Sequence, residues 1–152
     1  MSILNEIFAT IYETWFGLYN ADYDLIFATL YDEGGYQKLG LSFVLIPLTC
    51  WLLFYYVWKY PYAQLWHWLV WLLITAVIVA GISYGIANTE IFASNNQALN
   101  DALADESTNY KNYAETLPLT YSIYNGLFAI VLGFLYSLVM KQFSKIHTHL
   151  PF

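Results

Sequence analysis

Residues 39–58 read LGLSFVLIPLTCWLLFYYVW, and residues 63–89 read AQLWHWLVWLLITAVIVAGISYGIANT. Neither run contains a charged side chain, and only Lys59-Tyr60-Pro61-Tyr62 separates them. A helix of about 20 residues is about 30 Å long, which matches the hydrocarbon core of a bilayer. The two runs therefore predict antiparallel transmembrane helices over about 40–58 and 63–87, joined by a tight turn.

A third uncharged run extends from Thr116 to Met140, with Pro118 suited to a first helical turn. It predicts a third transmembrane helix over about 119–140. The composition agrees, since 59% of the residues are hydrophobic and 11% are charged, against about a quarter charged in a typical soluble domain. We expect an all-α integral membrane protein, with residues 39–152 forming a three-helix transmembrane domain.

Residues 1–38 form an acidic region with the pattern of an amphipathic helix. One face carries six apolar residues, and the other carries Glu6, Thr10 and Glu13. This polar face has no lysine or arginine, which helices on anionic membrane surfaces usually carry. Docking of the region against protein is therefore favoured over lying on anionic lipid. The apolar residues are Leu4, Ile7, Phe8, Ile11, Trp15 and Leu18.

The segment 88–118 is a polar loop rich in asparagine and acidic residues, with helical spacing around Leu99 and Leu103. Three transmembrane helices place this loop and residues 1–38 on one side of a membrane, and the 59–62 turn and the short basic C-terminal tail on the other. The turn and tail carry three of the five lysines, and all eleven acidic residues lie on the other side. The lysine rule then predicts an extracytoplasmic N-terminus and a cytoplasmic C-terminus, as in a bacterial inner membrane.

Tryptophan and tyrosine are concentrated around the 59–62 turn. Amphipathic rings of this kind gather at membrane–water interfaces, so the cluster predicts an interface belt. Its members are Trp51, Tyr55, Tyr56, Trp58, Tyr60, Tyr62, Trp66, Trp68 and Trp71.

Small residues recur at four-residue spacing in the second and third predicted helices. Such spacing lets helix backbones approach closely within a membrane. The residues either seat the two helices on each other or contact other subunits, and Asn125 is placed to hydrogen-bond across such an interface. The set is Ala76, Ala80, Gly81, Gly85, Asn125, Gly126, Ala129 and Gly133.

Few residues in the sequence are candidates for binding a metal ion, a cofactor or nucleic acid. His67, His147 and His149 share the turn side, but no carboxylate or thiolate there completes a metal site, so we expect no metal and no cofactor. Cys50 is the sole cysteine and is interpreted as a small buried hydrophobe. No arginine occurs, which excludes nucleic acid as an expected partner.

Transporters and intramembrane enzymes usually carry ionisable side chains within their helices, and none is found here beyond Cys50, the tyrosines and His67 near the 59–62 turn. We therefore expect a non-catalytic subunit of a larger membrane complex, with the lipid bilayer and other membrane subunits as partners. The alternative is a homo-oligomeric pore, since the predicted topology resembles that of class I holins.

Overall fold

The computed structural model describes residues 2–57 and 65–143, which form helices and contain no strand. The predicted all-α fold is confirmed. Three short helices, α1 (Ile3–Thr10), α2 (Asp24–Asp32) and α5 (Gln97–Ala104), accompany three long ones. The long helices are α3 (Gly35–Leu52), α4 (Leu65–Phe92) and α6 (Tyr110–Phe143). The π-helical turns η1 (Ile11–Trp15) and η3 (Leu53–Val57) extend α1 and α3, and a 3₁₀ turn, η2 (Ala21–Tyr23), precedes α2.

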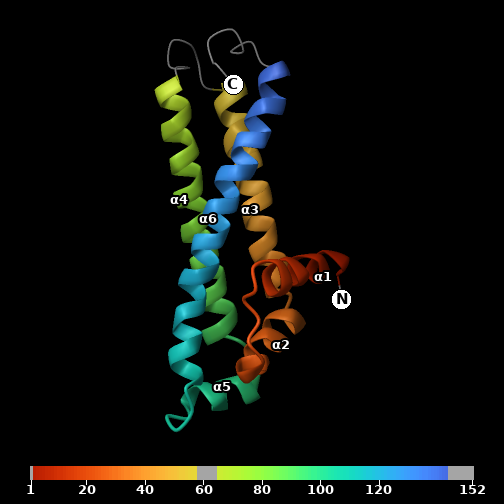
Figure 1. Cartoon of the computed structure of the whole chain (residues 1–152), viewed down its shortest axis with the longest axis vertical. Coiled ribbons are helices and arrows are strands. Elements are labelled where there is room, and N and C mark those ends of the chain that lie inside the picture. The colour runs from red at the N-terminus through yellow and green to blue at the C-terminus, as the bar shows by residue number, and fades with distance from the viewer. Residues whose placement is uncertain (1, 58–64, 144–152) are drawn as a thin grey trace.

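The three long helices run side by side as a bundle (Figure 1). Each is long and apolar enough to cross a membrane, over Gly35–Val57, Leu65–Phe92 and Tyr110–Phe143. All three reach further into the polar half of the molecule than predicted. The third begins at Tyr110 rather than near residue 119, because Ala114 and Leu117 bury their side chains in the core beside α2 and α5. Charge in the sequence therefore marked where the apolar stretch ends, and not where the helix ends.

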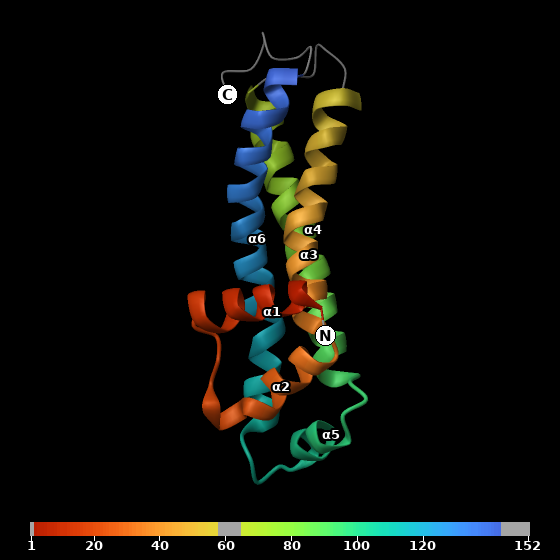
Figure 2. The ribbon, with the colours of Figure 1, turned by 90° about the vertical axis from the view of Figure 1, so that its right-hand side faces the viewer.

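A small cap of α2 and α5 closes one end of the bundle, together with the adjoining ends of α4 and α6 (Figures 1 and 2). Its core includes Ile26, Leu30 and Leu99, which are fully buried. The side chain of Asn96 accepts hydrogen bonds from the first backbone amides of α5 and donates one to Thr29 Oγ1 at 2.8 Å. The polar loop and α2 thus lie at the same end of the bundle (Figures 1 and 2). Helix α4 ends at Phe92, and α5 is a separate helix rather than its continuation.

Helix α1 lies across the long helices rather than along them (Figures 1 and 2). The ring of Phe8 covers Gly40 of α3, where any Cβ atom would overlap that ring. Phe8 also meets Phe43 edge-to-face with centroids 5.8 Å apart. Glycine at position 40 therefore allows α1 to sit directly on the backbone of α3.

Candidate functional site

A layer of buried hydrogen bonds centred on Asn125 joins α1 to all three long helices. The Asn125 amide nitrogen donates to the carbonyl oxygen of Leu39 on α3 at 3.2 Å and to Ser83 Oγ on α4 at 2.8 Å. Ser42 Oγ lies 2.9 Å from Ser83 Oγ and donates to the Leu39 carbonyl at 2.7 Å. Asn125 and Ser83 are fully buried. We call these four residues, with Tyr12, the polar layer.

Tyr12 connects the N-terminal region to this layer. Its hydroxyl donates to Asn125 Oδ1 at 2.6 Å, and its ring stacks on Tyr36 and meets Tyr121 edge-to-face. Burial raises the pKa of the Tyr12 phenol well above its ordinary value, so the group remains a neutral donor. The Tyr36 hydroxyl donates to Glu13 Oε1 at 2.7 Å, on the cap side of the layer. The site is therefore a structural junction between helices, in which burial keeps the Tyr12 phenol protonated.

Within the part of the chain that the structure describes, the fully buried polar side chains of α6 lie in two separate places, at the polar layer and near the opposite end of the bundle. The next fully buried hydrogen-bonded side chain along α6 is Ser137, twelve residues and about 18 Å further on. The half-buried Tyr136 also donates a hydrogen bond, from its hydroxyl to the Val44 carbonyl of α3 at 3.3 Å. The buried residues between Asn125 and Ser137 on α6 are Gly126, Ala129 and Gly133, which are apolar. On α4, the buried Thr75 hydroxyl donates to its own helix, at the carbonyl of Trp71. Among the described residues, the interior of α6 between Asn125 and Ser137 is therefore mainly apolar.

A cluster of aromatic side chains surrounds Ser137 at the end of the bundle opposite the cap. Trp68 Nε1 donates to Ser137 Oγ at 2.7 Å, and the Tyr55 hydroxyl lies 2.6 Å from the same oxygen. Trp51 fills the space over Gly133, where a Cβ atom would lie 2.6 Å from the Trp51 indole nitrogen. Trp51 is fully buried, and Trp68 is 4% exposed.

The aromatic residues expected to form an interface belt therefore divide into two groups. Trp51, Tyr55 and Trp68 are core residues of the bundle, whereas Tyr56 and Trp66 are exposed and Trp71 is half-buried. The density of indole and phenol rings in the sequence indicated amphipathic surroundings and did not distinguish inward from outward positions. Trp58, Tyr60 and Tyr62 lie outside the described residues.

The small residues also divide between inward and outward positions. A Cβ atom at Gly126 would lie 3.4 Å from Ala80 Cβ and 3.5 Å from the Ala76 carbonyl, so these three residues form the close contact of α4 with α6. Ala129 is fully buried. Gly81 and Gly85 instead face away from the bundle, and nothing lies within 4 Å of a Cβ atom at either. These two glycines therefore do not serve the packing of α4 on α6.

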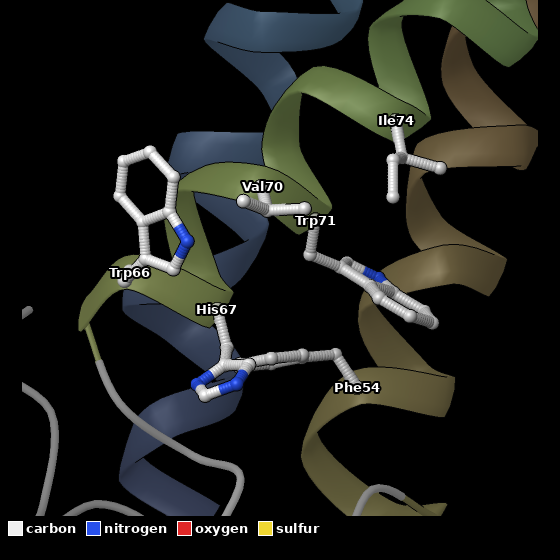
Figure 3. Close-up of a pocket in the computed structure, with 6 residues that line it drawn as sticks. All are labelled: Phe54, Trp66, His67, Val70, Trp71 and Ile74. Atoms are coloured by element: carbon white, nitrogen blue, oxygen red, sulfur yellow. The ribbon is translucent and has the colours of Figure 1, made fainter.

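An apolar groove and a pocket open on the outer surface of the bundle. The groove has a volume of about 260 Å³ and follows the contact of α4 with α6, past Ala76, Ala80 and Gly126. The pocket has a volume of about 280 Å³ and lies between α4 and the end of the α3 span (Figure 3). It is lined by Phe54, Trp66, His67, Val70, Trp71 and Ile74.

Of the three histidines considered as metal ligands, the structure describes His67. His147 and His149 lie outside the described residues. Within residues 2–57 and 65–143, no group of three or more histidine, cysteine, aspartate or glutamate side chains is placed to hold a metal ion. Cys50 is half-buried and unpaired, and its carbonyl oxygen accepts a hydrogen bond from the Trp71 indole at 3.0 Å.

The predicted apolar face of the N-terminal helix docks on the bundle only in part. Asn5, Phe8, Ala9 and Tyr12 pack inward, whereas Leu4, Ile7 and Trp15 are exposed. Of the predicted set, Phe8 is buried and Ile11 and Leu18 pack against the core, and the inward positions of Asn5 and Tyr12 were not predicted. Asn5 accepts from the Gln37 amide at 3.0 Å and donates to the Tyr31 carbonyl at 2.8 Å.

No family model, curated protein or solved structure matches this chain.

Proposed function

We propose that this chain is a non-catalytic subunit of a larger membrane complex, embedded through its three long helices. The outward surfaces of these helices support the embedding. Along the stretch of α6 from Tyr121 to Met140, every fully exposed side chain is apolar. On α4, Val77 is 72% exposed among apolar neighbours. Water would penalise so much exposed apolar surface, whereas lipid or a membrane partner would not.

The observation that carries the docking proposal is the outward position of Gly81 and Gly85. Glycine within a helix costs about 1 kcal/mol relative to alanine in water. At neither position does a close contact within this chain require glycine. In membranes, glycines at this spacing allow another helix to approach closely. The groove beside Ala80 widens this small-residue surface toward α6. We propose that a transmembrane helix of another subunit packs there.

The assignment as a non-enzyme rests on how the buried hydroxyl groups are used. Ser42, Ser83 and Ser137 take part in hydrogen bonds between helices. A nucleophile would need a neighbouring base, and the hydrogen-bond partners of these serines are hydroxyl, amide and indole groups and a backbone carbonyl. Their role in the proposal is to hold the helices in register.

The proposed location is a bacterial inner membrane, with the cap outside and the turn and C-terminal tail in the cytoplasm. The distribution of lysine supports this orientation. The cap then exposes acidic residues such as Asp101, Asp105 and Glu106 to a partner outside the membrane. Hydrogen bonds from Ser107 hold the pKa of Asp105 below its ordinary value, so this carboxylate stays charged at neutral pH.

The alternative, a homo-oligomeric pore, finds less support. A conducting pore needs polar side chains facing its lumen. Over residues 66–87 of α4, the fully exposed side chains are apolar, apart from Tyr84 and the two glycines. A ring of such chains would enclose a largely dry space.

Native electrophoresis of the tagged chain, extracted from its own cells in mild detergent, tests the proposal. The wild type should co-purify with fixed, different subunits. Gly81→Leu and Gly85→Leu should lose them, because each adds a large side chain to the docking surface. Val131→Leu is the control, since it enlarges another outward residue, on α6, that is 56% exposed.

Three results would count against the proposal. A wild-type chain that migrates as a monomer has no partner complex. A ring of identical chains supports the pore. Full-size complexes with both glycine variants would remove Gly81 and Gly85 from the docking surface.

A further inference from the structure

Helix α1, with its η1 extension, has three distinct faces. One face packs on the bundle through Phe8, Ala9 and Tyr12. A second carries the polar residues Glu6, Thr10 and Glu13. The third is apolar and exposed: Ile3 is 76%, Leu4 43%, Ile7 49% and Trp15 76% exposed. We call this third face the α1 apolar face.

The contacts of α1 show which way each face points. Glu13 accepts a hydrogen bond from Tyr36, in the first turn of α3, so the polar face turns toward the cap. Phe8 contacts Phe43, two turns further along α3, so the opposite side of α1 turns toward the far end of the bundle. Leu4 precedes Phe8 by four residues and lies on that side. The α1 apolar face therefore looks along the long helices, away from the cap.

The level of α1 along the bundle matches one boundary of a bilayer core. Phe8 covers Gly40, and α3 with its extension continues to Val57, seventeen residues or about 26 Å further. On α6, Asn125 lies at the level of Tyr12, and the helix runs eighteen residues, about 27 Å, to Phe143. A hydrocarbon core is about 30 Å thick. The helix thus lies about one core thickness from the far helix ends.

We propose that α1 lies in the boundary between headgroups and acyl chains of the leaflet on the cap side, with its apolar face immersed in that leaflet. This inference rests on the membrane location proposed above. Amphipathic helices that lie in this plane bury their apolar face about 5–10 Å into the boundary. The polar layer and the Phe8–Gly40 contact hold α1 perpendicular to the long helices, which is the orientation that immersion requires.

Lipid fits the α1 apolar face better than a protein partner because the face looks along the long helices, whose outward side chains beyond this level are apolar and exposed. Leu45 of α3, for example, is 49% exposed. The absence of lysine from α1, and the two carboxylates on its polar face, indicate that burial of apolar surface drives the contact. Zwitterionic lipid is therefore sufficient, and anionic lipid adds no attraction.

Depth-dependent quenching of a fluorescent label tests the inference. In a Cys50→Ala background, single cysteines at Ile7, Thr10 and Val77 carry an environment-sensitive bimane. Each variant is placed in phosphatidylcholine nanodiscs, whose two faces are both open to iodide. Separate samples contain lipids brominated near the headgroup or near the chain ends. Ile7 and Thr10 are matched, because both are exposed on the same helix on different faces.

The Ile7 label should be quenched by bromines near the headgroup and several-fold less by iodide than the Thr10 label. The Thr10 label should show the reverse preference. Equal iodide quenching at both positions would place the α1 apolar face in water and overturn the inference. Protection of the Ile7 label from both quenchers would mean that protein, such as a second copy of this chain, covers the face.

The Val77 label separates this inference from the proposed function. Val77 lies on the outward surface of α4 and should be quenched by brominated chains whatever the position of α1. If Val77 is quenched by bromine and Ile7 is not, the immersion of α1 is refuted and the membrane location stands. If the Val77 label escapes bromine and is quenched by iodide, the membrane location itself is refuted.

Discussion

Removing the Asn125 side chain should destabilise the fold more than any other single polar truncation in the bundle. Asn125→Ala removes three hydrogen bonds, to Leu39, Ser83 and Tyr12. The Leu39 carbonyl and Ser83 each keep Ser42 as a partner. The Tyr12 hydroxyl bonds to Asn125 alone among the described residues, so the substitution leaves it buried without a partner.

The size of the effect follows from that difference. A stranded buried hydroxyl costs about 1–3 kcal/mol. The other two bonds contribute about 0.6 kcal/mol each, the mean found between helices in membranes. The free energy of unfolding should therefore fall by about 2–4 kcal/mol. In the double variant with Tyr12→Phe, no hydroxyl is stranded, so the loss should be about 1–2 kcal/mol smaller than the sum of the single losses.

Unfolding in mixed micelles with increasing dodecyl sulfate, followed by helical circular dichroism, measures these free energies. The control is Asn88→Ala on the exposed surface of α4, which should change stability by less than about 0.5 kcal/mol. If Asn125→Ala behaves like Asn88→Ala, the polar layer does not hold the bundle together. Strict additivity with Tyr12→Phe would refute the direct coupling.

Two further predictions concern neighbouring features. Because the folded-state pKa of Tyr12 is raised, its contribution is complete below about pH 10 and is lost above it, by up to about 1.4 kcal/mol per pH unit. Tyr12→Phe should flatten this alkaline decline in unfolding free energy, and an unchanged slope would contradict the burial of the phenol. Gly133→Ala forces a Cβ against Trp51 and should cost about 1–2 kcal/mol in the same assay, whereas Gly81→Ala should gain up to about 1 kcal/mol through helix propensity. Equal effects of the two glycine substitutions would contradict the inward and outward placement.

The three long helices could be predicted because long uncharged runs have few alternatives in folding. Their bounds could not, because the outer turns of α4 and α6 bury apolar residues such as Ile91 and Leu117 within a polar stretch of sequence. The apolar pattern that identifies a transmembrane segment does not predict helical turns beyond the apolar run. Their helical state depends on the cap, which is formed by residues distant in the sequence.

The candidate site was predicted only in part. Asn125 was identified as a residue that could hydrogen-bond across helices, and it does so within this chain. Its partner Tyr12 was missed, because a tyrosine in an amphipathic segment gives no sign of pairing with a residue 113 positions away. The inward position of Asn5 was missed for the same reason, whereas Phe8 was correctly placed on the apolar face. A buried polar side chain needs a hydrogen-bond partner, and apolar periodicity does not show where that partner lies.

Polarised infrared spectroscopy in aligned bilayers tests the central claim most directly. If Gly35–Val57, Leu65–Phe92 and Tyr110–Phe143 cross the membrane, the amide I dichroism of the reconstituted protein should place most helical residues near the bilayer normal. Dichroism showing these helices in the membrane plane, or a protein that remains monomeric in water without lipid or detergent, would contradict the account.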